Sequence, residues 1–224
     1  MPGVLLDVNE TLLDLRGLQP IFDRIGLPDA MPVWFALTLR NGFALAASGD
    51  CRSFADIARD ALVSLDPSRI TASHGDALMD AFGELEPHPD VEDGLRTLAD
   101  AGIPAMTLTV GNAQMIERIF ERHGLDTLVA GHLSAADIGR WKPAPAPYLA
   151  ACLALGMQPR EVTMVAAHSW DLHGAHRAGL RTARVARRGQ TPSAVFAAPD
   201  ITGADLPSVS AQIVTAGTSP SGTR

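Results

Sequence analysis

Apolar residues follow two different spacings along this chain, and the change in spacing predicts its architecture. Residues 3–8 form a short, almost uninterrupted apolar run, typical of a buried strand that ends at Asp7. After residue 14 the apolar positions recur at helical spacing instead, with turn residues between the segments. Helical segments are predicted at 18–26, 33–47, 54–65 and 69–85.

From residue 86 onward, helical and strand patterns alternate. Helices are predicted at 89–102, 112–124, 145–156, 171–179 and 206–214, and strands at 105–110, 128–132, 162–167, 182–186 and from residue 200. This alternation predicts an α/β fold, in which a Rossmann-like parallel sheet is covered by helices on both faces.

The helical stretch between the first two strands is too long for a simple crossover between neighbouring strands. It therefore predicts an inserted all-helical cap. We expect an α/β core of residues 1–14 and 86–214, a cap of residues 15–85, and a disordered Ser/Thr/Gly/Pro-rich tail at 215–224.

The composition narrows the class of protein. Of 224 residues, 46% are hydrophobic and 19% are charged, so the chain can bury a sizeable core. A net charge of −7 without a basic run argues against nucleic acid or an anionic membrane as the main partner. No apolar stretch is long enough to span a membrane, and no signal peptide precedes Asp7. With Cys51 and Cys152 interpreted as free thiols, these features predict a cytoplasmic protein.

Lysine usage singles out one position. Arginine supplies 17 of the 18 basic residues, and the remaining one is Lys142. The only tyrosine, Tyr148, follows six residues later. Because a compact ammonium and a planar guanidinium do not replace each other in a tight site, Lys142 is a candidate functional residue.

Polar residues also lie where strands of the predicted sheet end. Asp7 ends the first strand, Thr109 ends the second, and residues 166–171 follow the strand at 162–167. Ligands bind beyond the carboxyl ends of the strands in open α/β sheets. We therefore expect these residues to converge at one edge, together with the loop that carries Lys142.

Four segments stand in an informative order: Asp-Val-Asn-Glu-Thr-Leu-Leu-Asp at 7–14, Leu-Thr-Val-Gly-Asn at 108–112, Arg-Trp-Lys-Pro-Ala-Pro-Ala-Pro-Tyr at 140–148, and Val-Ala-Ala-His-Ser-Trp-Asp at 165–171. Together they resemble the haloacid dehalogenase superfamily and, within it, the type II 2-haloacid dehalogenases. The resemblance covers nearly the whole chain, including a helical cap inserted just after the first segment.

The resemblance implies a role for each catalytic position. Asp7 would be a carboxylate nucleophile, kept ionised by Lys142, with Thr11 bonded nearby. Asp171 would anchor Lys142. His168 would activate the water that hydrolyses an ester intermediate.

The resemblance also implies a substrate pocket. An anionic group of the substrate would meet Thr109 and the N–H groups of Val110 and Gly111. The other expected substrate-binding residues are Asn9, Tyr148, Trp170 and Phe54. The family's cap arginine usually follows a tryptophan, but here Phe35 follows Trp34. Arg40, which lies one helical turn after Ala36, is the nearest replacement.

Two losses in these segments distinguish among the superfamily's activities. Its phosphatases have a second acid two residues after the nucleophile, where this chain has Asn9. They also hold magnesium through acids of the fourth segment, whose usual Gly-Asp is replaced here by Ala167 and His168. The leading hypothesis is therefore metal-independent hydrolysis of short 2-haloalkanoic acids. The alternatives are a magnesium-dependent phosphatase and a catalytically silent protein that binds a small ligand.

Three histidines, His168, His173 and His176, lie close together in the fourth segment and its helix. Their spacing is not that of a known zinc site. We therefore expect no metal and no cofactor. The expected partners are a small carboxylic acid and a halide ion, and the chain could form a homodimer.

Overall fold

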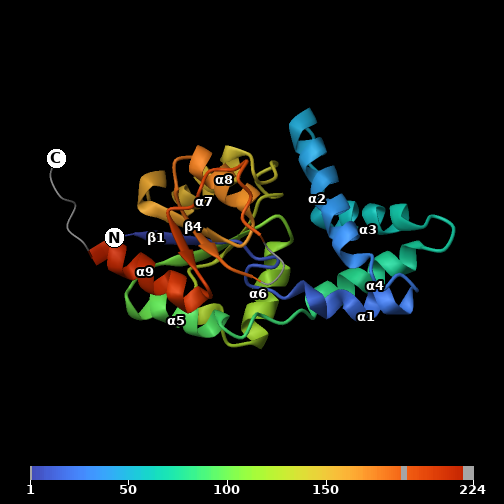
Figure 1. Cartoon of the computed structure of the whole chain (residues 1–224), viewed down its shortest axis with the longest axis horizontal. Helices are drawn as coiled ribbons and strands as arrows, with labels where there is room; N and C mark the ends of the chain where they lie inside the picture. Colours follow the sequence, from blue (N-terminus) through green and yellow to red (C-terminus); the bar gives the residue numbers. More distant parts are fainter. Residues whose placement is uncertain (1, 188–190, 219–224) are drawn as a thin grey trace.

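The computed structural model describes residues 2–187 and 191–218, and a parallel sheet forms its centre (Figure 1). Its strand order is β3-β2-β1-β4-β5-β6, and every neighbouring pair is parallel. The strands are β1 (Gly3–Leu6), β2 (Ala105–Thr109), β3 (His132–Ser134), β4 (Val162–Ala166), β5 (Arg181–Val185) and β6 (Ile201–Gly203). The predicted Rossmann-like α/β fold is thus confirmed.

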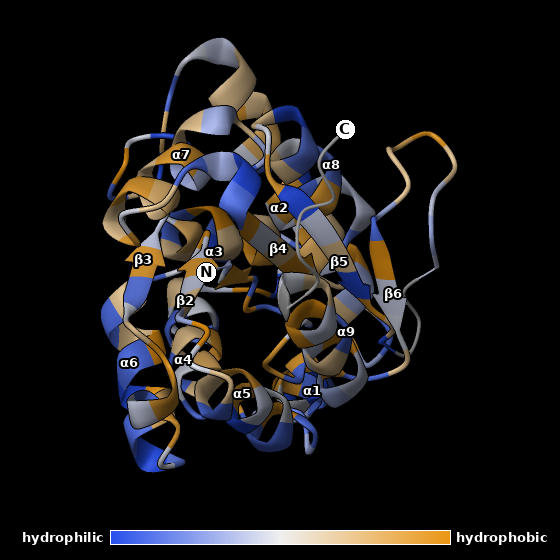
Figure 2. Cartoon of the chain, turned by 90° about the vertical axis from the view of Figure 1, so that its left-hand side faces the viewer, coloured by the Kyte–Doolittle hydropathy of each residue, from blue (hydrophilic) through white to orange (hydrophobic). Residues whose placement is uncertain are grey.

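Helices cover both faces of this sheet (Figure 2). Helices α7 (Pro145–Ala154) and α8 (Ser169–Arg177) lie on one face, and α5 (Val91–Asp100) and α9 (Leu206–Thr218) on the other. Helix α6 (Ala113–Arg122) packs near β3. Successive residues of β1 pack on opposite faces of the sheet, because side chains along a strand point alternately to its two sides. Leu5 joins the hydrophobic cluster under α7 and α8, whereas Val4 and Leu6 join the cluster on the other side.

The chain between β1 and α5 forms helices that stand beside the sheet (Figure 1). These are the short η1 (Leu15–Leu18), α1 (Gln19–Arg24), α2 (Met31–Ser48), α3 (Phe54–Leu65) and α4 (Ala72–Gly83). Local chemistry sets their ends. Gly49, at φ 87°, terminates α2, and the Ser53 side chain accepts the Asp56 N–H at the start of α3.

Two predicted boundaries were wrong. The strand expected at 128–132 begins only at His132, because a single turn (η2, Asp126–Leu128) and Gly131, at φ 148°, precede it. The tail expected from residue 215 begins inside α9, which continues to Thr218. The last turn of α9 packs on the start of the chain: a Cβ at Gly217 would lie 2.8 Å from the Pro2 ring. Residues 219–224 lie outside the described part of the chain.

Among the helices of the described residues, none combines the length and the hydropathy that crossing a membrane requires.

Candidate active site

Asp7 lies directly after β1, the strand between β2 and β4. Its backbone N–H donates to Val165 O at 2.9 Å, so the ladder with the β4 strand continues up to this residue. The Asp7 side chain is buried, with an exposed fraction of 6%. The central position at the carboxyl edge fixes this carboxylate among groups from several loops, as the strand-end pattern predicts.

Lys142 reaches Asp7 from the loop before α7. Its Nζ donates to Asp7 Oδ1 at 2.7 Å, to Asp171 Oδ2 at 2.6 Å and to Leu108 O at 2.8 Å. The ammonium is fully buried, and these three acceptors match its three N–H donors. This geometry explains why lysine occupies the position in a chain that otherwise uses arginine: a planar guanidinium does not present three diverging donors from one atom.

Thr11 holds the other oxygen of Asp7. Its hydroxyl donates to Asp7 Oδ2 at 2.6 Å and accepts the Ala167 N–H at 3.0 Å, which ties the loop after β1 to the loop after β4. The Thr11 carbonyl in turn accepts two bonds from the Arg187 guanidinium, at 3.0 and 2.8 Å. Arg187 also pairs with Asp90 at 2.7 Å. Sequence reasoning missed this support, because neither residue belongs to one of the four segments.

Tyr148 orients Asp171. The tyrosine hydroxyl donates to Asp171 Oδ1 at 2.6 Å, while Lys142 occupies Oδ2. Gly174, one turn later on α8, allows this contact, since a Cβ there would lie 2.7 Å from the tyrosine oxygen. The resemblance assigns Tyr148 to substrate binding, but its buried hydroxyl is engaged with Asp171.

The charges of this cluster shift its pKa values in opposite directions. Burial alone would raise the pKa of Asp7, but the Lys142 ammonium and the His168 ring outweigh it and hold the pKa below its usual value. Burial, partly offset by Lys142, raises the pKa of Asp171 to about 6. Burial would lower the pKa of Lys142, yet the two carboxylates raise it. An ionised Asp7 beside a charged lysine is the state that a carboxylate nucleophile requires.

His168 contacts Oδ2 of Asp7, whereas Lys142 binds Oδ1. Its Nδ1 lies 3.4 Å from Asp7 Oδ2, and its Nε2 lies 3.2 Å from Glu10 Oε2. Burial would lower the pKa of His168, but its hydrogen bonds with Asp7 and Glu10 outweigh this and raise it to about 9. The ring is therefore an imidazolium at neutral pH while Asp7 is free. Sequence reasoning missed Glu10, because a glutamate in a polar turn looks like an ordinary solvent-facing residue.

The substrate-side residues lie around the same edge. Thr109 is buried at the end of β2, and its oxygen accepts the Gly111 N–H at 2.9 Å, so that amide already has a partner. Phe54, Val110 and Gly111 line a cavity of about 310 Å³ between the helical segment and the sheet edge. Asn9 is buried, and neither its amide nitrogen nor its oxygen has a partner among the described residues. Unpaired buried polar atoms are costly, so this amide suits a polar ligand.

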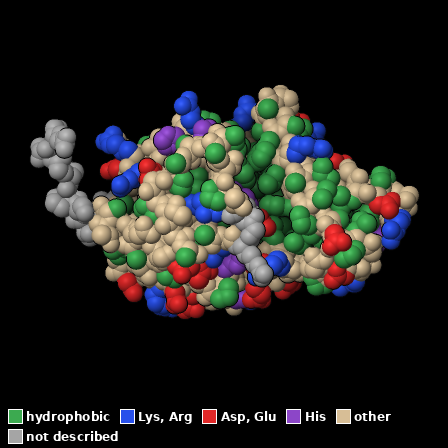
Figure 3. All heavy atoms as spheres, in the orientation of Figure 1, with side chains coloured by type: hydrophobic (Ala, Val, Ile, Leu, Met, Phe, Trp, Pro, Cys, Tyr) green, Lys and Arg blue, Asp and Glu red, His purple; other side chains and the backbone are tan. Residues whose placement is uncertain are grey.

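Aromatic rings surround His168. Trp170 on α8 lies 5.6 Å from the His168 ring and 4.9 Å from Phe43 on α2, and Phe35 lies 6.2 Å from His168 (ring centroids). Figure 3 shows hydrophobic side chains along a hollow between the sheet-bearing half and the helical half. Asp7 thus faces apolar surroundings in which its charge interactions are strong.

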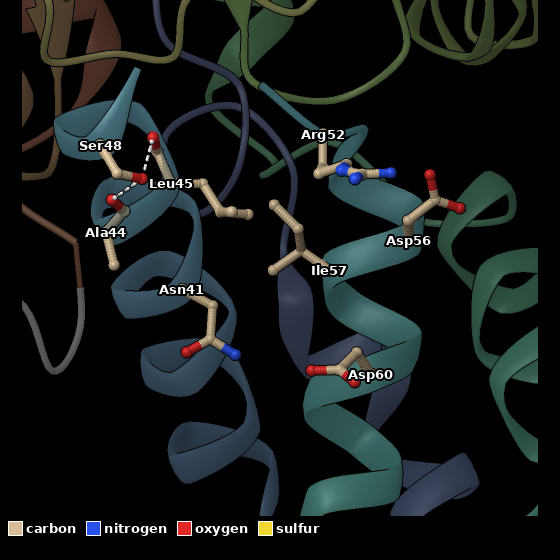
Figure 4. A pocket seen from close by; sticks show the side chains of 8 residues that line it. All are labelled: Asn41, Ala44, Leu45, Ser48, Arg52, Asp56, Ile57 and Asp60. Atoms are coloured by element: carbon tan, nitrogen blue, oxygen red, sulfur yellow. Dashed lines mark hydrogen bonds between the residues drawn. The ribbon is translucent and has the colours of Figure 1, made fainter. Parts of the chain in front are cut away.

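Arg40 is not part of this group. Its side chain is exposed and donates to Asn41 Oδ1 at 3.1 and 2.9 Å. Asn41 lines a separate hollow of about 600 Å³ between α2 and α3, with Leu45 and Ile57 among the residues around it (Figure 4). Among the described residues, no hydrogen bond or ion pair joins Asp7 or His168 to a residue lining that hollow, so it is distinct from the reactive centre.

Within residues 2–187 and 191–218, no cluster of three or more His, Cys, Asp or Glu side chains has a geometry suited to a metal ion.

Comparisons with known proteins agree with this geometry. A family model for haloacid dehalogenase-like hydrolases matches residues 1–179. (S)-2-Haloacid dehalogenase 4A of Burkholderia cepacia is 38% identical over 122 residues, which cover 54% of this chain and 53% of that protein. (S)-2-Haloacid dehalogenase 2 of Pseudomonas sp. strain CBS-3 is 25% identical over 205 residues, which cover 88% of this chain and 89% of that protein. The chain spans about half the length of the first curated relatives it matches.

Solved structures share the fold over nearly their whole length. L-2-Haloacid dehalogenase from Xanthobacter autotrophicus superposes with a TM-score of 0.88 at 22% identity, over 98% of this chain and 100% of that one. A dehalogenase solved as an intermediate complex gives a TM-score of 0.81 at 28% identity, over 92% of this chain and 94% of that one. An aspartate and a lysine paired at the central strand of this sheet, together with a family model that matches most of the sequence, show that the chain belongs to the haloacid dehalogenase-like hydrolases.

Proposed function

We propose that this protein hydrolyses short 2-haloalkanoic acids through an ester on Asp7, without a metal ion. The observation that carries the proposal is the identity of the group facing Asp7 Oδ2, which is His168. A phosphatase of this fold needs a divalent cation against its nucleophile. An imidazolium there repels such a cation, whereas it tolerates a neutral carbon electrophile and a departing halide.

The first step is displacement at the α-carbon of the substrate. One oxygen of Asp7 forms a bond to this carbon as the carbon–halogen bond breaks, and the halide leaves with the bonding electrons. No proton is needed, because a halide ion is stable as an anion. The absence of an acid at position 9 therefore costs this reaction nothing, although it would cost a phosphatase about 10²–10⁴ in rate.

The second step is hydrolysis of the Asp7 ester. Water attacks the carbonyl carbon of Asp7, and the 2-hydroxy acid departs. Lys142 stays bonded to Asp7 Oδ1, where it stabilises the negative charge that develops on this oxygen. Each turnover thus restores the carboxylate.

The relatives and the site both support this substrate class. The names of the relatives specify 2-haloacids, and a solved dehalogenase 28% identical to this chain was obtained as an intermediate complex. The unpaired amide of Asn9 and the hydroxyl of Thr109 are suited to the carboxylate of such an acid. Phe54 and Trp170 would line the apolar side of the pocket.

We propose that residues 15–85 act as the cap and residues 1–14 and 86–214 as the core. Contacts between Trp141, in the Lys142 loop, and helices α2 and α3 support this division, because they would couple the helical segment to the nucleophile.

A cytoplasmic location is supported by the free thiols of Cys51 and Cys152. The expected homodimer is tested by light scattering during size-exclusion chromatography.

One assay panel separates the proposal from its alternatives. Halide release from 2-chloro- and 2-bromopropionate and phosphate release from small phosphomonoesters are measured with EDTA and with added Mg²⁺. We expect halide release that EDTA leaves unchanged. Phosphate release that depends on Mg²⁺, without halide release, would establish the phosphatase instead. Release of neither ion from a well-folded protein would favour the silent ligand-binding alternative.

A further inference from the structure

Glu10 has a backbone conformation that is unusual for its residue type. Its φ is 56°, and it is the one non-glycine residue in the described part of the chain with a positive φ. It is the third residue of a tight turn in which the Thr11 N–H donates to Val8 O at 3.2 Å. Glycine is favoured at such a position, because a Cβ makes the left-handed region costly. Strain of this kind persists where the surrounding structure enforces it, often at functional sites.

The strained residue contacts the reactive centre through its side chain. Glu10 Oε2 lies 3.2 Å from His168 Nε2, while His168 Nδ1 lies 3.4 Å from Asp7 Oδ2. Glu10, His168 and Asp7 thus form a continuous chain of polar contacts. The His168 side chain is 7% exposed, and that of Glu10 is 29% exposed, so the outer carboxylate reaches solvent while the ring does not.

The other charged side chains at Asp7 already have hydrogen-bond partners for all of their donors or oxygens. Asp171 is fully buried, and its two oxygens accept bonds from Lys142 and Tyr148. Lys142 uses its donors on three acceptors. The charged groups that face His168 are Asp7 and Glu10, and its neighbours from α2 and α8 are uncharged rings. His168 is therefore the group on Asp7 that is free to exchange a proton.

We propose that Glu10 is a positioning residue that holds His168 as a cation beside the free Asp7 carboxylate and as the general base once Asp7 is esterified. The proposal rests on the haloacid hydrolysis proposed above. Its basis is electrostatic and geometric. Esterification removes the negative charge of Asp7, which is one of the two charges that favour the protonated ring. The bond with Glu10 then keeps the Nε2 proton in place and leaves Nδ1 facing the ester as the acceptor.

The protons balance over one turnover. When Asp7 displaces the halide, the ring gives up its Nδ1 proton to solvent. In hydrolysis Nδ1 takes a proton from water as the water oxygen bonds to the Asp7 carbonyl carbon. The tetrahedral group collapses, and the departing alkoxide takes that proton to become the 2-hydroxy acid. The Asp7 carboxyl then returns its own proton to His168, which restores the starting state.

The test uses Glu10→Gln and Glu10→Gly in the full chain. Rapid-quench halide measurement and intact-protein mass spectrometry follow the two steps separately. We expect both variants to keep a fast release of about one halide per enzyme, to accumulate the ester adduct, and to lose about 100-fold in kcat. His168→Asn should accumulate the same adduct. Glu10→Gly also removes the strained Cβ, so an unchanged or higher Tm shows that the loss is not one of folding.

A matched control is Glu86→Gln, which breaks a surface His–Glu contact of the same 3.2 Å length, with His123. This variant should keep the wild-type kcat. A second readout is independent of turnover: the His168 ring, followed by NMR, should titrate at a pH lower by about one unit or more in Asp7→Asn, whose amide mimics the neutral ester. The same titration midpoint in both proteins would overturn the proposal.

The outcomes separate the two proposals. If wild-type protein releases halide and Glu10→Gln keeps the wild-type kcat without accumulating the adduct, the role of Glu10 is overturned and the proposed function stands. If the wild-type protein releases no halide, the proposed function is overturned, and the hydrolytic step of His168 with it.

Discussion

The indole ring of Trp141 packs directly on the backbone of Gly42, near the middle of α2. The same ring donates from Nε1 to Arg52 O at 2.9 Å and stacks near Phe54 on α3. The next residue in the chain is Lys142, which holds the nucleophile. A single dipeptide therefore joins the helical segment to the reactive centre, and Gly42 supplies the space that this junction needs.

We expect Gly42→Ala to destabilise the protein by about 1–3 kcal/mol, because the added methyl group overlaps the Trp141 ring. Halide release should fall as well, since a displaced Trp141 moves Lys142. Urea unfolding and the halide assay measure the two effects. Gly83→Ala is the matched control, because Gly83 is also helical and a Cβ there meets nothing within 4 Å. Equal stability of the two variants would contradict the tight fit at Gly42.

Lys142→Arg should be nearly as damaging as Lys142→Ala. The ammonium has no exposed surface and donates in three directions, which leaves no room for a longer, planar fork. Loss of one partner of such a buried pair costs about 3–5 kcal/mol, and halide release should become undetectable. Chemical unfolding and the halide assay give both values. An arginine variant with wild-type turnover would make the lone lysine a coincidence of codon usage.

The sequence pattern was sufficient for most of the fold, because the apolar spacing of each element reflects its own burial. The four helical segments between β1 and β2 and the strand–helix alternation after residue 86 follow this rule. The boundaries that were wrong depend on contacts with distant residues. Thr218 ends α9 three residues after the predicted start of the tail because the last turn lies against Pro2, which no local pattern reports.

The site was predictable where a residue sits at the end of a strand or in one of the four segments. Asp7 and Lys142 were predicted in this way, and Lys142 Nζ lies 2.7 Å from Asp7 Oδ1. Arg40 was expected to replace the family's cap arginine but bonds to Asn41 at the surface, since helical spacing alone does not orient α2 against the sheet. Glu10 was missed although it stands in the first segment, because neither its backbone angle nor its contact with His168 can be read from spacing.

Stability should fall as the pH rises from about 6.5 to 9, and His168 is the cause. Its pKa is about 9 in the folded protein against 6.5 as an ordinary value, so folding holds its proton more tightly. This contribution is complete below pH 6.5 and is lost as the pH passes the folded-state pKa. The difference corresponds to about 3 kcal/mol of unfolding free energy.

Urea unfolding at several pH values measures how the free energy of unfolding changes with pH. His168→Asn should flatten this dependence, and the exposed His176→Asn should keep it. The neighbouring groups act outside the window: the pKa of Asp171 is raised only to about 6, that of Asp7 is lowered, and that of Lys142 is raised above 10.5. A wild-type curve that is flat between pH 6.5 and 9 would contradict the ion pairs of His168 with Asp7 and Glu10.

Asp7→Asn should abolish halide release while the protein stays folded. The amide is a far weaker nucleophile, so we expect a loss of about 10³-fold or more. Lys142 keeps its bonds to Asp171 and to Leu108 O, which leaves the buried ammonium paired. Circular dichroism and Tm check the fold, and the halide assay checks the activity. Appreciable turnover in this variant would remove Asp7 from the chemistry.

The route of the solvent oxygen distinguishes covalent catalysis from direct attack of water. If Asp7 forms an ester, water attacks the aspartyl carbonyl, so the solvent oxygen enters the Asp7 carboxylate first. A single turnover in ¹⁸O-labelled water, with enzyme in excess over substrate, should therefore label the peptide that contains Asp7 and leave the product acid nearly unlabelled. Asp7 as a mere general base would place the label directly in the product. The bonds from Lys142 and Thr11 to separate oxygens of Asp7 favour the covalent route, because they fix the carboxylate in the orientation that attack on the α-carbon requires.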